Sequence, residues 1–212
     1  MDTLDSRALS YVDCFARRFA KAGSVTYGIT SASVRCGLHD EDAFVIDVQE
    51  RRQAGGKGEN AQHDVTVKMK AGRFTVEPAK LSIQAGDVVM WHAASSAVPG
   101  FIVSGQAGDL RFSSASLDAE SLYTHAFGVP GTYEWGDTGQ SKIGGRVVVK
   151  DLDTKSKEDC EKWMSSLSEG ALVTIKGRAE PQQVEIVTGQ TVFFAVVDAP
   201  GITITDQRLK IG

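Results

Sequence analysis

The side chains that could do chemistry in this chain are its histidines, cysteines and serines. His63, His92 and His125 are separated by about thirty residues each, with no second ligand type at metal-binding spacing beside them. A metal site needs ligands that converge with the right geometry. We therefore interpret these three histidines as scattered residues that are not ligands.

No catalytic motif accompanies the serines. The sequence holds no Gly-rich phosphate loop, no His-Glu-x-x-His and no Gly-x-Ser-x-Gly, which are the patterns that place a phosphate, a zinc ion or a nucleophilic serine. Ser104 and the run from Ser113 to Ser116 fall in expected loops without a recognisable base. We predict no catalytic residue and expect that the protein is not an enzyme.

Charge excludes two classes of partner. The 212 residues carry a formal net charge of -4 and no basic stripe, whereas a nucleic-acid surface or an anionic membrane requires clustered Lys and Arg. Acidic and basic residues also interrupt the first twenty positions, which excludes a signal-peptide core or a direct membrane span there. If the protein is exported, we expect its leader to be absent from this sequence.

The three cysteines do not form a disulfide framework. Cys14, Cys36 and Cys160 are odd in number and irregularly spaced, so a disulfide-rich secreted scaffold is not predicted, although one pair remains possible.

The elements that must position these residues are mostly strands. From His63 onward, short runs alternate polar and apolar residues, as in the run from Val65 to Met69, and Gly residues separate the runs about every ten positions. This spacing is typical of two packed antiparallel sheets. One helix is expected between residues 153 and 171, because Ser156 begins a capping box and the apolar stripe that follows ends at Gly170.

Three segments in register resemble the cupredoxin family of plastocyanin and amicyanin. They are the run from Phe74 to Trp91 with its Gly-Asp turn, the segment from Phe127 to Trp135 with Pro-Gly-Thr-Tyr, and the closing strand from Gly145 to Val149. The resemblance implies a Greek-key β-sandwich over residues 63–152. It also implies an exported or lumenal compartment, such as a periplasm, for a family of copper proteins.

The copper ligands that the resemblance would require are missing from this copy. A type 1 copper site uses two imidazoles, a thiolate and a weak axial thioether. The family pattern places Gly100 at the first His, and Asp137, Gln140 and Ile143 near the Cys, the second His and the Met. We expect this domain to be free of copper, with Trp91 and Trp135 as core residues.

The chain also contains an internal repeat. Residues 179–194 repeat residues 76–91 without a gap at an offset of 103 (179 minus 76), and residues 9–28 follow residues 117–136 at an offset of 108 (117 minus 9). The chain thus begins with the second half of a cupredoxin-like unit and ends with the first half of another. We expect residues 1–50 and 172–212 to form a second, circularly permuted sandwich, with residues 153–171 as a helical connector. Exchange between chains, as a swapped dimer or a filament, is the alternative.

One candidate copper site remains in the permuted copy. The segment Cys36-Gly-Leu-His39-Asp-Glu-Asp42 has the Cys-x-x-His spacing of the short cupredoxin ligand loop. Gly201 occupies the first-His position of that copy, and Asp40 and Glu41 suit a solvated turn equally well.

These patterns predict a non-enzymatic, copper-free structural or protein-interaction subunit whose partners are other protein subunits, with no cofactor. The alternative is a copper protein for electron transfer or metal delivery that uses Cys36 and His39. A module that binds a small molecule or glycan in its loops is a third hypothesis.

Overall fold

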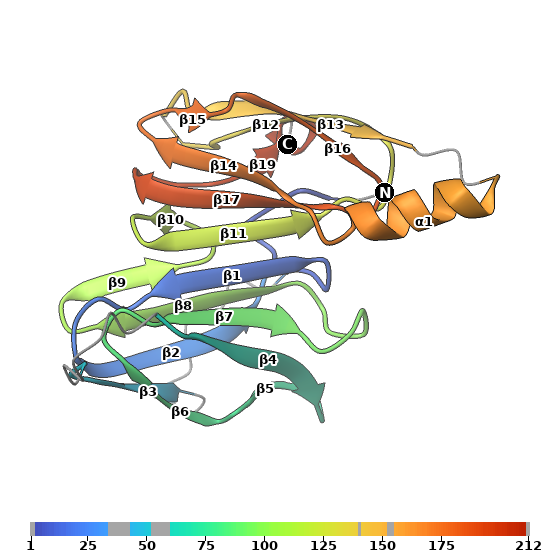
Figure 1. Cartoon of the computed structure of the whole chain (residues 1–212). Helices are drawn as coiled ribbons and strands as arrows, with labels where there is room; N and C mark the ends of the chain where they lie inside the picture. The colour runs from blue at the N-terminus through green and yellow to red at the C-terminus, as the bar shows by residue number, and fades with distance from the viewer. Residues whose placement is uncertain (1–2, 34–42, 52–59, 140, 152–154, 211–212) are drawn as a thin grey trace. The chain divides into compact units, whose positions relative to one another are not determined.

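The computed structural model describes residues 3–33, 43–51, 60–139, 141–151 and 155–210, and they form two compact units (Figure 1). Residues 7–116 form one, called here the N-terminal unit. Residues 1–6 and 117–212 form the other, called the C-terminal unit. Strands dominate both units and are arranged in several sheets, which confirms the expected all-β, sandwich-like class.

The N-terminal unit contains two groups of strands. The first has the order β1-β7-β4-β5, and the second has the order β6-β3-β2-β8-β9. The strands are β1 (Asp13–Arg18), β2 (Gly23–Ser31), β3 (Phe44–Gln49), β4 (Gln62–Lys70), β5 (Arg73–Glu77), β6 (Lys80–Gln84), β7 (Val88–Ala93), β8 (Phe101–Ala107) and β9 (Leu110–Ser113).

The C-terminal unit also contains two main groups of strands, in the orders β15-β14-β17-β11 and β16-β13-β12-β19, and a short β10-β18 pair. Its elements are β10 (Leu117–Asp118), β11 (Ser121–Ala126), β12 (Gly131–Gly136), β13 (Gly144–Lys150), α1 (Lys157–Ser166), β14 (Ala171–Lys176), β15 (Ala179–Glu180), β16 (Gln183–Val187), β17 (Thr191–Asp198), β18 (Pro200–Ile202), β19 (Thr205–Asp206) and the 3-10 helix η2 (Gln207–Lys210).

Each unit buries its own aromatic core. In the N-terminal unit, Trp91 is fully buried and its ring stacks on Phe15, with centroids 5.5 Å apart. In the C-terminal unit, Trp135 is 1% exposed and meets the edge of Phe194 at 5.1 Å. Alternating strand residues supply these side chains, because successive residues of a strand point to opposite faces. The expectation that Trp91 and Trp135 are core residues is confirmed.

The expected helix forms within residues 153–171. The Ser156 side chain accepts a hydrogen bond from the Asp159 backbone N–H at 3.0 Å, as the capping pattern predicts. Trp163 donates from Nε1 to the Thr188 carbonyl at 2.8 Å and holds the helix on the turn before β17. No helix among the described residues is long and apolar enough to cross a membrane.

Both ends of the described chain meet in the C-terminal unit. The backbone N–H of Ser6 donates to the Ile204 carbonyl at 3.0 Å, and that of Asp206 donates to the Leu4 carbonyl at 2.8 Å. Leu4 is fully buried. The first residues of the chain therefore complete a unit that is otherwise built from its second half.

The strands are divided between the units differently from the domains expected from the sequence. β4 to β9, expected in a domain over residues 63–152, lie with β1 to β3, whereas β10 to β13 lie with β14 to β19. The parallel pair β3-β6 lies within the N-terminal unit, and the parallel pair β13-β16 lies within the C-terminal unit. Residues 1–50 and 172–212 thus belong mainly to different units.

Candidate functional site

The four positions that the cupredoxin pattern assigns to copper do not come together in one unit. Gly100 belongs to the N-terminal unit, whereas Asp137 and Ile143 belong to the C-terminal unit. Gln140 lies outside the described residues. The sequence pattern predicts all four in one domain, whereas the described ones are divided between the two units.

Asp137 is held in a network of hydrogen bonds. Its Oδ1 accepts from the backbone N–H of Thr203 at 3.0 Å and from the Thr203 hydroxyl at 3.2 Å, while Oδ2 accepts from the Ser141 N–H at 3.2 Å. Burial by itself would raise the pKa of Asp137, but the hydrogen bonds from Thr203, Ser141 and Gly139 outweigh it and lower that pKa. The carboxylate is therefore ionised at neutral pH.

This donor set does not fit a type 1 copper site. Asp137 and Thr203 offer oxygen atoms, and those of the carboxylate already accept hydrogen bonds from neighbouring N–H and O–H groups. Copper in such sites is held by imidazole and thiolate. The network joins the end of β12 to the segment before β19, because the Thr138 N–H also donates to the Thr203 hydroxyl at 2.7 Å. Its evident role is structural.

The alternative copper ligands Cys36 and His39 lie outside the described residues, as do Asp40, Glu41 and Asp42. Cys14 and Cys160 are described, and neither is in a disulfide.

The histidines of the described chain do not converge. The Nε2 atom of His92 lies 3.3 Å from the Thr66 hydroxyl on the neighbouring strand. His125 is fully buried, with its ring 4.5 Å from that of Phe127. In the part of the chain that the structure describes, no three His, Cys, Asp or Glu residues are grouped to hold a metal ion.

His63 takes part in a charged cluster around Asp87, which the sequence did not reveal. Asp87 Oδ1 accepts from Arg51 Nη2 at 2.7 Å and from the Ala61 N–H at 3.0 Å. Its Oδ2 accepts from the Gln84 N–H and from His63 Nε2, both at 3.0 Å. The ring nitrogen must carry the proton, since a carboxylate only accepts.

The cluster favours an ionised Asp87. Burial opposes ionisation, but the hydrogen bonds from Ala61, Gln84 and His63 and the charge of Arg51 prevail and lower the pKa of Asp87 to about 2. Arg51 also donates from Nε to the Ala85 carbonyl at 2.9 Å. These contacts fasten both ends of the connection between β3 and β4 to the Gly86-Asp87 turn. The sequence indicates this cluster only through the Gly86-Asp87 pair, which is typical of a turn, and through Arg51, which follows β3.

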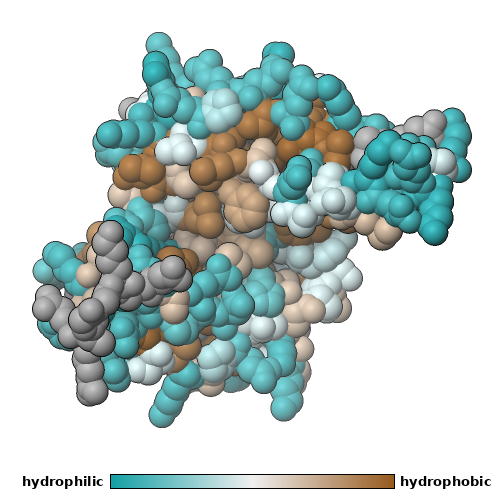
Figure 2. Space-filling model, viewed as in Figure 1, coloured by the Kyte–Doolittle hydropathy of each residue, from teal (hydrophilic) through white to brown (hydrophobic). Residues whose placement is uncertain are grey.

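A third feature is an apolar surface on the C-terminal unit. The outward side chains of β14 and β17 include Leu172, Phe193 and Val197, which are 57%, 36% and 53% exposed. Leu172 and Phe193 are register partners. Figure 2 shows apolar side chains gathered over this part of the unit. We call this surface the outer face and define it by six uncharged residues: Leu122, Leu172, Thr174, Phe193, Ala195 and Val197.

In the N-terminal unit, the outward positions of β4 and β7 carry both polar and apolar residues. Asp64 pairs with Met90 there, and Thr66 pairs with His92. Strand order alone therefore does not make an outward face apolar. In the sequence, only the mostly apolar runs of β14 and β17 indicate an exposed apolar face. Such runs also occur in strands that are buried on both faces, so they do not predict it.

No protein-family model, curated protein or solved structure matches this chain.

Proposed function

We propose that this chain is a non-enzymatic, copper-free protein-interaction subunit built from two cupredoxin-like sandwiches. The resemblance to cupredoxins rests on the sequence segments around Trp91 and Trp135. In both units a strand containing one of these segments pairs with a strand from the other half of the sandwich. In this proposal each unit is circularly permuted, with the second half of the sandwich before the first half in the chain. It replaces the single permuted sandwich of residues 1–50 and 172–212 that the sequence predicts.

Equivalent hydrogen bonds in the two units support the proposal of two copies. The Phe19 N–H donates to the Asp87 carbonyl and the Gly86 N–H to the Phe19 carbonyl. In the same way, Phe127 donates to Gln190 and receives from Gly189. Each of these turns precedes a strand that pairs in parallel with a partner, β7 with β4 and β17 with β14.

The outer face is the observation that carries the interaction role. Exposure of large, adjoining apolar side chains to water is unfavourable, and their burial by a partner lowers the free energy by roughly 25 cal/mol for each Å². The outward face of β4 and β7 shows that a similar strand arrangement tolerates charge and hydroxyl groups there. An apolar outer face is therefore not required for folding of the unit.

The oxygen-rich network of Asp137 supports the copper-free part of the proposal. It uses the carboxylate for structural hydrogen bonds within the unit. No catalytic role is proposed for Asp87 either, because its two oxygen atoms accept four hydrogen bonds that fix the neighbouring chain segments.

Two measurements test this proposal. The first is the native mass of the species that contains the chain in an extract of cells expressing it. We expect an assembly that Phe193→Asp dissolves and that Leu110→Asp, a change at an exposed residue of the N-terminal unit, leaves intact. Recovery of the wild-type chain only as a single free chain contradicts the interaction role.

The second measurement is metal analysis of the purified protein after loading with copper. We expect less than stoichiometric copper and no intense thiolate-to-copper absorption. Stoichiometric binding that Cys36→Ser abolishes would refute the copper-free proposal and support the copper alternative with Cys36 and His39.

A further inference from the structure

We propose that the edge of β19 in the C-terminal unit binds residues 3–6 of a second copy of this chain, in exchange for its own residues 3–6. The two copies are then joined head to tail. β19 belongs to a different group of strands from the outer face, so this inference goes beyond the proposed function.

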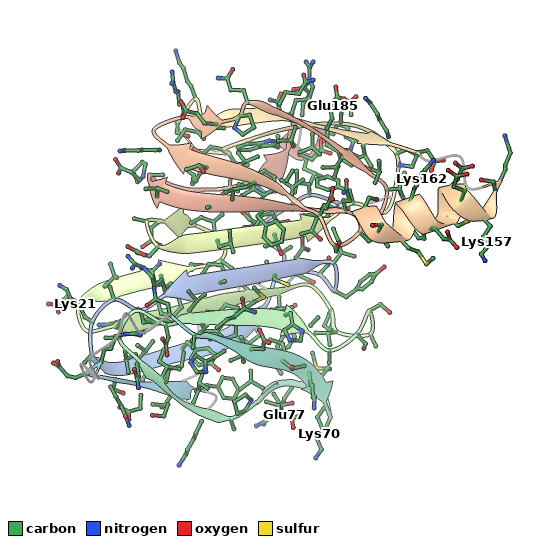
Figure 3. All side chains as sticks on the ribbon, in the orientation of Figure 1. Lys21, Lys70, Glu77, Lys157, Lys162 and Glu185 are labelled. Carbon is green, nitrogen blue, oxygen red and sulfur yellow. The ribbon has the colours of Figure 1, made fainter. Side chains whose placement is uncertain are left out.

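Residues 3–6 cover an edge strand. β19 ends the order β16-β13-β12-β19, and Figure 3 labels Glu185 on β16, at the other end of that order. The edge strand of a sheet presents backbone N–H and C=O groups to any segment that can pair with them. In this structure the pairing segment is residues 3–6, which identifies the sequence that fits the site.

The segment is held by specific contacts. Ser6 and Ile204 share two hydrogen bonds of 3.0 Å, because the Ser6 N–H donates to the Ile204 carbonyl and the Ser6 hydroxyl accepts from the Ile204 N–H. Asp5 lies opposite Thr205, whose hydroxyl donates to Asp5 Oδ1 at 3.3 Å. Leu4 and Ser6 are fully buried. One apolar side chain and one serine therefore anchor the segment.

The N-terminal unit is closed in the same way by residues 110–114. The Ser114 N–H donates to the Val103 carbonyl at 2.9 Å, and the Ser114 hydroxyl accepts from the Val103 N–H at 3.1 Å. Phe112 is 4% exposed and Ser114 is fully buried. A large apolar residue followed two positions later by a buried serine thus closes both units, since residues 4–6 have this pattern too.

The two closing segments differ in how they are connected. In the N-terminal unit, β9 follows β8 after a two-residue turn at 108–109 and pairs with it as a hairpin. In the C-terminal unit, the bonded residues Asp5 and Thr205 are 200 positions apart. The connection therefore does not fix which copy supplies residues 3–6, and a second copy would make the same contacts. Exchange of an identical element between copies is a low-cost route to association.

The order of the segments along the chain favours a second copy as the partner. Residues 110–116 close the N-terminal unit and lead directly into the C-terminal unit at Leu117. Residues 3–6 close the C-terminal unit and lead directly into the N-terminal unit at Arg7. When residues 3–6 come from a second copy, this alternation of unit and closing segment continues from chain to chain. Such a contact is heterologous, so it can repeat.

Undocking of so short a segment is a local event that leaves the rest of the unit folded. The segment of the same chain competes with that of a second copy, with an effective concentration on the order of 1 mM for a flexible connection. Below that concentration, the exchanged fraction should therefore increase in proportion to the protein concentration.

A disulfide that only two different copies can form tests the inference. One full-length chain carries Asp5→Cys and another carries Thr205→Cys. Opposed residues of an antiparallel pair have Cα atoms about 4.5–5.5 Å apart, which is within the range of roughly 4.4–6.8 Å that a disulfide spans. The chains are mixed under reducing conditions and then oxidised, and peptide mass spectrometry identifies the link between positions 5 and 205. We expect its yield to increase roughly tenfold between about 0.05 mM and about 0.5 mM protein.

Glu185→Cys, in place of Thr205→Cys, is the matched control for random collision. Glu185 is exposed on the opposite edge strand of the same group, so this chain should lose most of the link to position 5. Leu4→Asp, added to the Asp5→Cys chain, should also abolish most of the link, because it would bury a charge in the partner. Leu110→Asp in the same chain should leave the link unchanged. Circular dichroism and thermal melting verify that each variant is folded.

A chain that carries both Asp5→Cys and Thr205→Cys separates exchange from closure within one copy. If this chain forms the link at about 1 µM but the mixed single variants do not form it at the highest concentration, the inference is overturned. It is also overturned if the chain with both changes forms no link, or if Glu185→Cys links as well as Thr205→Cys. None of these results decides the proposed interaction role, which depends on Phe193 in the outer face.

Discussion

Replacement of Asp87 by Asn should destabilise the N-terminal unit. The Asp87 side chain is 6% exposed and accepts four hydrogen bonds, two of them from the cationic or imidazole groups of Arg51 and His63. The amide group of Asn keeps only one acceptor oxygen. Its NH₂ group replaces the second oxygen and faces N–H groups that it cannot accept hydrogen bonds from. It also removes the charge opposite Arg51.

The magnitude follows from the pKa of the carboxyl group. Lowering it from 3.8 to about 2 corresponds to about 2.4 kcal/mol, at 1.36 kcal/mol for each pKa unit. Because the pKa is lower in the folded state, this stabilisation is fully present above pH 3.8 and is lost as the pH falls through about 2. Asp87→Asn should therefore cost about 2 kcal/mol at neutral pH and much less in strong acid.

Urea unfolding at a series of pH values from about 2 to about 7 measures both effects. The wild-type free energy of unfolding should fall more steeply with acid than that of the variant. Asp64→Asn is the matched control, because Asp64 is an exposed carboxylate whose Oδ1 contacts Gln62 Nε2 at 3.0 Å. A cost below about 0.5 kcal/mol at pH 7, or equal acid slopes for wild type and Asp87→Asn, would refute the reasoning.

Three further changes test the fold. Leu4→Ala should lower the free energy of unfolding by about 2–4 kcal/mol in urea, because the side chain is fully buried; a cost below about 1 kcal/mol would show that the N-terminal segment does not hold the C-terminal unit. Gly105→Ala should cost at least about 2 kcal/mol, since its Cβ would lie 2.6 Å from Phe112 Cζ. Gly100→Ala, with no neighbour closer than 3.8 Å, is the control, and an equal melting temperature of the two variants would contradict the expected clash. Trp163→Ala should release α1 and lower the helical circular dichroism signal, because the hydrogen bond to Thr188 is lost; an unchanged signal would contradict this anchoring role.

Short-range patterns in the sequence determined the elements. The Ser156 capping box predicted the helix, and the capping hydrogen bond to Asp159 is present. Alternation predicted strands, and the large aromatic side chains of Trp91 and Trp135, expected in the core, are buried. These features depend on residues a few positions apart, so a single sequence can show them.

Only the tertiary structure decided which strands pair and which side chains meet. Local patterns in the sequence predict single strands but not their partners, because pairing joins segments far apart in the chain, as β3 with β6 and β13 with β16. The same limit hid the cluster of Arg51 and Asp87, which lie 36 residues apart. It hid the outer face as well, since the sequence shows that β14 and β17 are apolar but not that one side of their sheet stays exposed.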